Sequence, residues 1–71
     1  MSLTTVAANV RAELARRQLR QGEVAEHLGM TQRAVSRRVR GEVEWNGEQL
    51  RLLAQLFEIP VSTLLGEELS A

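Results

Sequence analysis

The 71-residue chain contains no cysteine, so it can form neither a disulfide nor a thiolate–metal bond. Its single histidine, His27, cannot build a metal site with others of its kind. No apolar run approaches the roughly 20 residues that a membrane-spanning helix needs. The segment MSLTTVAANV at residues 1–10 lacks the basic stretch and apolar core of an export signal. These absences predict a cytoplasmic protein with no membrane contact, metal or disulfide.

Proline and aromatic residues are also scarce, with one proline, one tryptophan, one phenylalanine and no tyrosine. No segment alternates apolar and polar residues over the length of a strand. The sequence therefore predicts a single all-α domain spanning residues 1–71. It contains no nucleophile–base pair, metal cluster or phosphate-binding loop. We accordingly expect a non-enzymatic protein without a cofactor or a small-molecule ligand.

Apolar residues at helical spacing predict a compact bundle of about five short helices. They are expected at about residues 5–17, 21–28 and 32–40 and, on either side of a break at Ile59-Pro60, within residues 47–65. The expected N-caps are Thr4 or Thr5, Thr31 and Asn46, the last with Gln49 as its capping-box partner. Gly29 and Gly41 fit two helix ends because glycine adopts positive φ freely. Trp45 is expected to fill the core.

The joint between the second and third helices is the most informative connection. Only the three residues GMT separate them, so the two helices must cross at a steep angle, as in a helix-turn-helix. The expected helix-turn-helix covers about residues 21–40.

The charges of the chain are balanced in total but sorted along its length. Nine arginines and nine glutamates give a formal net charge of zero. Residues 11–40 hold eight arginines and three glutamates (8 − 3 = +5), whereas residues 41–71 hold one arginine and six glutamates (1 − 6 = −5). Such an asymmetry is typical of a surface that binds nucleic acid, and on charge alone a solvated helical surface with sorted charges is the alternative.

The third predicted helix carries this positive charge on one side. At 3.6 residues per turn, Val35 and Val39 share the opposite, apolar side with Ala34. The polar side holds Gln32, Arg33, Ser36, Arg37 and Arg40. A guanidinium matches guanine O6 and N7, and a glutamine amide matches adenine N6 and N7. The helix therefore presents the side chains that read a DNA major groove.

The segment QGEVAEHLGMTQRAVSRRVRG resembles the helix-turn-helix of the Cro/lambda-repressor (XRE) family of phage and bacterial regulators. The resemblance spans about residues 10–65, including LRLLAQLFEIPVSTLL, which is similar to the family's fourth and fifth helices. It rests on Gln21, Ala25, Gly29, the TQ pair at 31–32, Val35 and Gly41.

This resemblance implies which side chains contact DNA. Base contacts are implied for Gln32, Arg33 and Arg37, with Ser36 nearby. Phosphate contacts are implied for Gln21, Thr31, Arg40 and Asn46.

Two departures from the family pattern concern arginines. Arg20 stands where the family has Ser or Thr, so the second helix loses its usual cap while the chain gains another phosphate ligand. Arg38 stands where the family has Ile or Leu. We expect Val39 to take over the packing while the stem of Arg38 lies along the surface, and a phosphate contact by Arg38 is the alternative.

The resemblance predicts a sequence-specific double-stranded DNA-binding repressor of the phage or prophage type, which blocks polymerase by occupying its operator. Two alternatives stay open. One is an antitoxin that controls its own operator, and the other is a protein-interaction module of the same fold that does not bind DNA. Leu52 and Leu56 fall outside the apolar stripe of the fourth helix. These two leucines either cover the fifth helix or, together with Leu65 and Leu69, form the contact of a weak homodimer that pairs on DNA.

Overall fold

The structure is a computed structural model that describes residues 3–66. Its elements are five helices: α1 (Leu3–Arg17), α2 (Gln21–Leu28), α3 (Gln32–Val39), α4 (Gly47–Phe57) and α5 (Val61–Leu65). Residues 3–66 contain no strand, so the predicted all-α fold is confirmed. None of the helices is long and apolar enough to span a bilayer.

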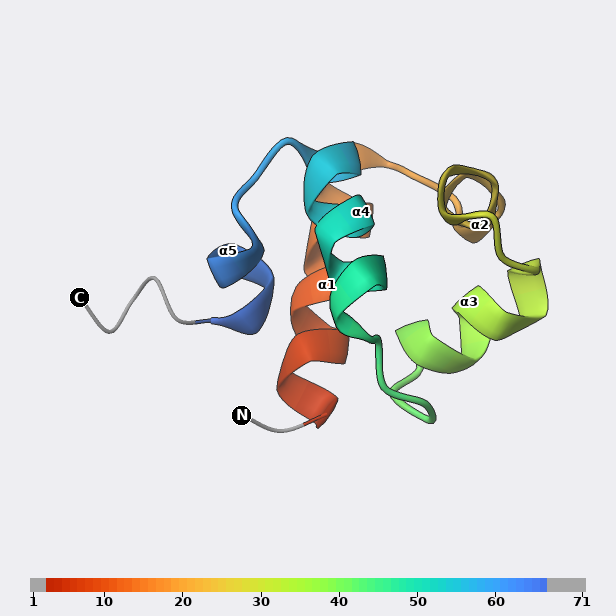
Figure 1. Ribbon diagram of the computed structural model, residues 1–71, viewed down its shortest axis with the longest axis horizontal. Helices are drawn as coiled ribbons and strands as arrows, with labels where there is room; N and C mark the ends of the chain where they lie inside the picture. Colours follow the sequence, from red (N-terminus) through yellow and green to blue (C-terminus); the bar gives the residue numbers. More distant parts are fainter. Residues whose placement is uncertain (1–2, 67–71) are drawn as a thin grey trace.

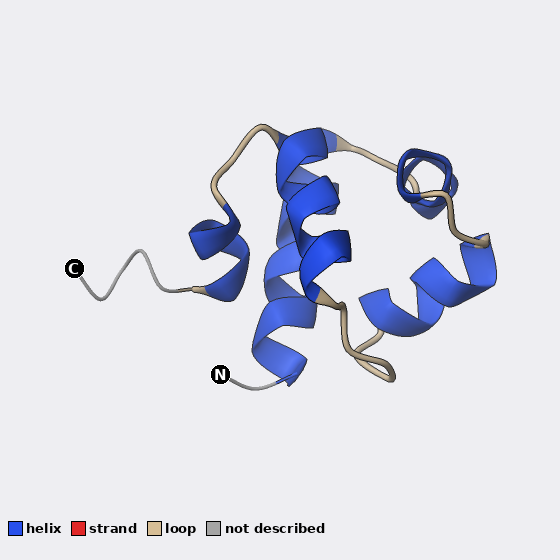
Figure 2. Cartoon of the chain, in the orientation of Figure 1, coloured by secondary structure: helices blue, strands red, loops and turns tan. Residues whose placement is uncertain are grey.

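The helices form one bundle in which α2 and α3 make up one end and α5 the other (Figures 1 and 2). α2 packs against both α3 and α4, while α1 contacts α3 and α5. The α2–α3 pair is therefore anchored from two sides, α3 by α1 and α2 by α4. This anchoring fixes the orientation of α3 relative to the rest of the domain.

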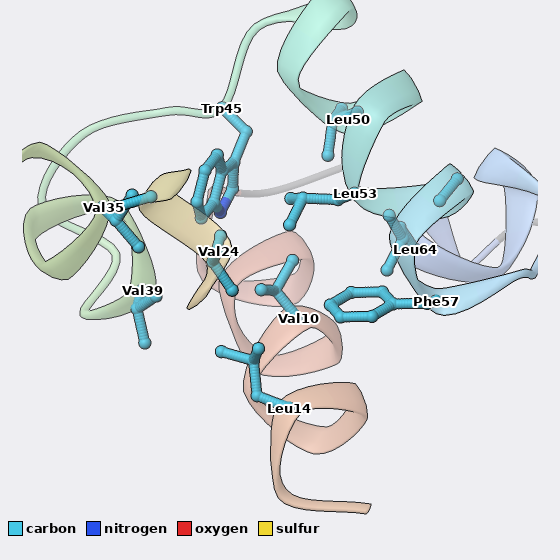
Figure 3. Close-up of a cluster of buried hydrophobic side chains, with 12 residues drawn as sticks. Val10, Leu14, Val24, Val35, Val39, Trp45, Leu50, Leu53, Phe57 and Leu64 are labelled. Carbon is cyan, nitrogen blue, oxygen red and sulfur yellow. The ribbon is translucent and has the colours of Figure 1, made fainter. Parts of the chain in front are cut away.

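Every helix contributes to one core. Each of the five supplies one side chain with no exposed surface, namely Val10, Val24, Val35, Leu53 and Leu64. Trp45, from the loop between α3 and α4, is 5% exposed and belongs to the same cluster, as expected (Figure 3). The loop that follows α3 is therefore attached to the core through the Trp45 indole.

The predicted boundaries of α2 and α3 are confirmed to within a residue. Gly29 ends α2 with a φ of 67°, in the left-handed region that glycine occupies without a Cβ clash. α3 begins after Thr31, whose Oγ1 accepts a hydrogen bond from the N–H of Ala34 at 3.1 Å. Val39 is its last residue, and Gly41 follows with a φ of 83°.

The predicted start of α1 is wrong. The helix begins at Leu3, so Thr4 and Thr5 lie within its first turn rather than at its N-cap. No glycine or proline at residues 3–5 opposes helical φ and ψ, and Leu3, Thr4 and Thr5 are all helical. A cap residue can mark a boundary only where the preceding residues leave the helix.

The predicted apolar surface on α4 and α5 also needs correction. Leu56 and Leu65 are partly buried and pack against the core. Leu52 is partly buried as well but does not join that packing. Leu69 lies outside the described residues. The apolar surface that α4 leaves without a core partner therefore centres on Leu52.

A buried carboxylate ties α1 to the end of α4. The side chain of Glu13 is only 8% exposed, and its Oε2 lies 2.7 Å from Nη1 of Arg16. Its Oε1 forms an ion pair with Arg17. The Arg17 guanidinium also donates to the carbonyl of Phe57 at 2.9 Å and lies 5.2 Å from the centroid of the Phe57 ring. Sequence reasoning did not identify this network.

The Glu13 network predicts an acid-sensitive fold. Burial acts to raise the pKa of Glu13, but the hydrogen bonds and charges of Arg16 and Arg17 outweigh it and lower the pKa below its ordinary value of 4.5. A carboxyl whose pKa is lower in the folded state stabilises the fold above its unfolded pKa, and this contribution disappears as the pH falls through the folded pKa.

Glu13→Gln should therefore reduce the free energy of unfolding at pH 7 by about 1.5–3 kcal/mol, the contribution of a hydrogen bond to a charged group. The variant and the parent should converge below pH 4.5. Denaturant unfolding followed by circular dichroism between pH 7 and pH 3 measures this. Glu26→Gln removes an exposed carboxylate of α2 and is the control. A constant gap between Glu13→Gln and the parent at every pH would contradict the prediction.

Candidate nucleic-acid interface

α3 has one buried face and one exposed face. Val35 and Val39 are 0% and 6% exposed and turn inward, where α3 packs on α1 and α2. Gln32, Arg33 and Arg37 are exposed on the other side of the helix. The predicted division of this helix into an apolar and a polar face is therefore confirmed.

The exposed face continues onto the first turn of α2. The side chain of Gln32 lies against Gly22. Its Oε1 is 3.5 Å from the position that the Cβ of a larger residue at Gly22 would occupy. Gln21, the first residue of α2, is partly buried beside it. The N-terminus of α2, with its backbone N–H groups and positive dipole end, and the start of α3 thus form one continuous polar surface.

Arg20 occupies the N-cap position of α2 but does not cap it through its side chain. A guanidinium has no acceptor atom, so it cannot receive a backbone N–H. The backbone N–H of Arg20 instead donates to the Glu23 carboxylate at 3.0 Å. The expected loss of the usual cap is confirmed, and the exposed Arg20 guanidinium has no partner within residues 3–66.

Two N-cap residues for which phosphate contacts are predicted, Thr31 and Asn46, each have a hydrogen-bond donor that is not used within residues 3–66. The Thr31 hydroxyl oxygen accepts from Ala34, so its hydrogen is still available for donation. Asn46 exchanges hydrogen bonds with Gln49, at 2.8 Å through its Oδ1 and at 3.0 Å through its backbone N–H. In the described part of the chain, the amide NH₂ of Asn46 makes no hydrogen bond.

At the end of α3, two arginines contact the carboxylate of Glu42, which sequence reasoning missed. Arg40 donates through Nε to Glu42 Oε2 at 2.6 Å and through Nη1 to the Ser36 hydroxyl. The Nε of Arg37 lies 3.8 Å from Glu42 Oε1. The hydrogen bond from Arg40 is the main reason that the pKa of Glu42 is lowered and that of Arg40 is raised.

Arg33 and Arg38 differ in their surroundings. The side chain of Arg33 is exposed and makes no hydrogen bond or ion pair within residues 3–66. Arg38 is partly buried, donates to the Ala34 carbonyl at 2.9 Å, and has an Nε that is buried without a partner. Its side chain lies along the helix while Val39 takes the core position, as expected. The structure therefore does not bring Arg38 onto the face that carries Arg33 and Arg37.

Arg11 is a second residue that sequence reasoning missed. From α1, its Nη1 donates to the carbonyl of Val39 at 2.7 Å. This carbonyl belongs to the last turn of α3, where helix carbonyls lack an intrahelical partner and a cation is favoured. Arg11 thereby fastens the C-terminal end of α3 to α1. No local pattern signals this contact, because it joins residues 28 positions apart.

Two helices joined by a three-residue turn, the second anchored by valines and exposing Gln and Arg, define a helix-turn-helix DNA-binding domain. A family model described as "Helix-turn-helix" matches residues 10–64, and the chain belongs to this family, in its Cro/lambda-repressor type. It carries the DNA-binding domain of a transcription regulator. No significant match is found among curated proteins or among solved structures.

Proposed function

We propose that this chain binds a specific double-stranded operator with α3 in the major groove and represses transcription there, as an immunity-type regulator of a phage or prophage. The observation that carries the proposal is the exposed face of α3, where Gln32, Arg33 and Arg37 stand together opposite the buried valines. α3 itself contains no acidic residue that would repel DNA. Repression then follows from occlusion of the promoter.

In this proposal, sequence is read by the side chains at the centre of the face. Arg33 and Arg37 each donate two hydrogen bonds to a guanine, and Gln32 pairs with an adenine. Ser36 lies one turn from Gln32 and contacts a neighbouring base edge. The Arg33 guanidinium makes no competing hydrogen bond in the described chain, which leaves all of its donors available.

The residues around the face hold the phosphates and set the register of α3. Arg20 and Gln21 do so at the N-terminus of α2, and Thr31 at the start of α3. Arg40 and Asn46, beyond the C-terminal end of α3, contact other phosphates of the DNA backbone. Arg38, which lies along α3, reaches a phosphate only if its bond to Ala34 opens.

Selection of binding sites from random duplex DNA tests the proposed function. We expect one short consensus containing guanines, bound with an affinity that falls steeply with salt. On a template whose promoter overlaps that consensus, added protein should prevent transcription by a purified polymerase. Enrichment of no sequence, or a bound operator that is still transcribed, would contradict the proposal.

We further propose that two copies of the chain occupy the operator. An eight-residue recognition helix reads only a few base pairs, and regulators of this kind gain affinity by placing two such helices about 34–36 Å apart. The surface around Leu52 on α4, with the outer edges of Leu56 and Leu65, is proposed to form the contact. Because this surface is small, the dimer should be weak and form mainly on DNA.

Leu52→Glu should abolish pairing without unfolding the domain, since Leu52 does not pack against the core. Sedimentation on the selected operator should show two protein copies for the parent and one for the variant. Gln55→Glu adds the same charge to an exposed position of α4 and should keep two copies. One parent copy per duplex, on a site without symmetry, would refute the dimer.

A further inference from the structure

Glu42 is held at the end of the recognition helix by the backbone. Gly41, with a φ of 83°, turns the chain after α3. The N–H of Glu42 then donates to the carbonyl of Arg37 at 2.9 Å. Its position relative to α3 is therefore set by the C-terminal capping turn rather than by the mobile end of its own side chain.

The carboxylate of Glu42 contacts one edge of two arginines of the proposed DNA-binding face. It accepts from the Nε of Arg40 at 2.6 Å and lies 3.8 Å from the Nε of Arg37. Within residues 3–66, the terminal amino groups of Arg37 make no hydrogen bond. These terminal amino groups are the donors that would form hydrogen bonds to the O6 and N7 of a guanine. Glu42 thus forms an ion pair with the Nε edge of the Arg37 guanidinium and leaves the terminal donors of Arg37 unoccupied.

The Glu42 pairs have little importance for folding. The side chains of Glu42, Arg37 and Arg40 are all about half exposed, at 50%, 53% and 53%. Ion pairs in such positions contribute little to stability. We expect these ion pairs to affect DNA binding instead. A carboxylate at this edge repels the phosphates of DNA and orients the arginines beside it.

We propose that Glu42 is a specificity-determining residue of the DNA-binding face. On random DNA, affinity comes almost entirely from phosphates, so the repulsion by Glu42 acts in full. On the operator, an arginine held in one orientation makes its two base hydrogen bonds with less loss of side-chain entropy. Glu42 therefore weakens binding to random DNA more than binding to the operator. This inference rests on the proposed function.

The test compares Glu42→Gln with Glu44→Gln, which removes an exposed carboxylate two residues further on that has no arginine partner in the described chain. Binding of each full chain to the selected operator and to a random duplex is measured between 50 and roughly 200 mM salt, the range over which counterion release is pronounced. A thermal melt of each variant should match that of the parent.

We expect Glu42→Gln to raise affinity for random DNA about threefold to tenfold more than Glu44→Gln does, with a salt slope steeper by about one unit. Its ratio of operator to random affinity should fall by about the same factor. In an Arg37→Ala background, Glu42→Gln should lower that ratio less, because no guanidinium remains to be oriented.

Equal ratios for Glu42→Gln, Glu44→Gln and the parent would overturn the inference about Glu42 while leaving the proposed function intact. A parent chain that binds neither duplex in a salt-dependent way would overturn both. The two failures are therefore distinguished by the parent's own binding curves.

Discussion

Val35→Asp is expected to unfold the domain. Val35 lies at the centre of α3 with no exposed surface, so the substitution would place a carboxylate in the core without a partner. Burying an unpaired charge costs far more than the few kcal/mol that separate folded from unfolded states in a small domain. A circular dichroism melt should show no cooperative transition at pH 7, and binding to the selected operator should be lost with it.

Gln32→Asp is the matched control for this prediction. It makes the same change of charge on the same helix, but at an exposed position in the first turn. There the helix dipole stabilises an acidic side chain. This variant should melt close to the parent while binding DNA poorly. A Val35→Asp domain that melts like the parent would mean that the buried face of α3 is assigned incorrectly.

Arg33→Ala and Arg37→Ala should each weaken binding to the selected operator by about 1–3 kcal/mol and relax the preference for guanine at one position. Each loses two directed hydrogen bonds to a base as well as one positive charge. Arg40→Ala should instead weaken binding to the operator and to random DNA alike and reduce the salt slope by about one.

Competition binding separates the two kinds of arginine. Operator duplexes with each guanine replaced in turn are titrated against the parent and the three variants. The parent should discriminate at the guanine that Arg33 or Arg37 contacts, and the corresponding alanine variant should not. If Arg33→Ala and Arg37→Ala lose the same amount of binding affinity for the operator as for random DNA, these residues contact phosphates and the assignment of base readout is wrong.

The sequence predicted α2, the turn and α3 well because their signals are local. Gly29 and Thr31 mark the two sides of the turn, and the spacing of Val35 and Val39 sets the phase of α3. Each of these features depends on residues within a few positions of one another. The match of the family model over residues 10–64 agrees with this assignment.

The sequence failed where contacts join distant segments or depend on a side chain's reach. The bond from Arg11 to Val39 and the link from Arg17 to Phe57 connect helices that no spacing rule relates. The periodicity of α4 placed Leu56 outside the apolar stripe, yet it packs against the core. A helical wheel gives the direction of a side chain but not which neighbouring helix covers it.

Glu42 illustrates the same limit at the candidate site. In the sequence it is one of several glutamates in an acidic stretch, and its charge indicates only a solvated loop. The turn at Gly41 brings it back beside Arg37 and Arg40. Its relation to the DNA-binding face therefore depends on the geometry of the helix end.

Methylation interference on the selected operator tests most directly whether α3 reads the major groove. Methylating guanine at N7 blocks the acceptor that a guanidinium uses there and leaves the minor groove unchanged. We predict that the complex with the parent chain excludes DNA methylated at the guanines of the consensus. We also predict that Arg33→Ala and Arg37→Ala each lose this sensitivity at one of them. Full binding to DNA methylated at every consensus guanine would contradict major-groove recognition by α3.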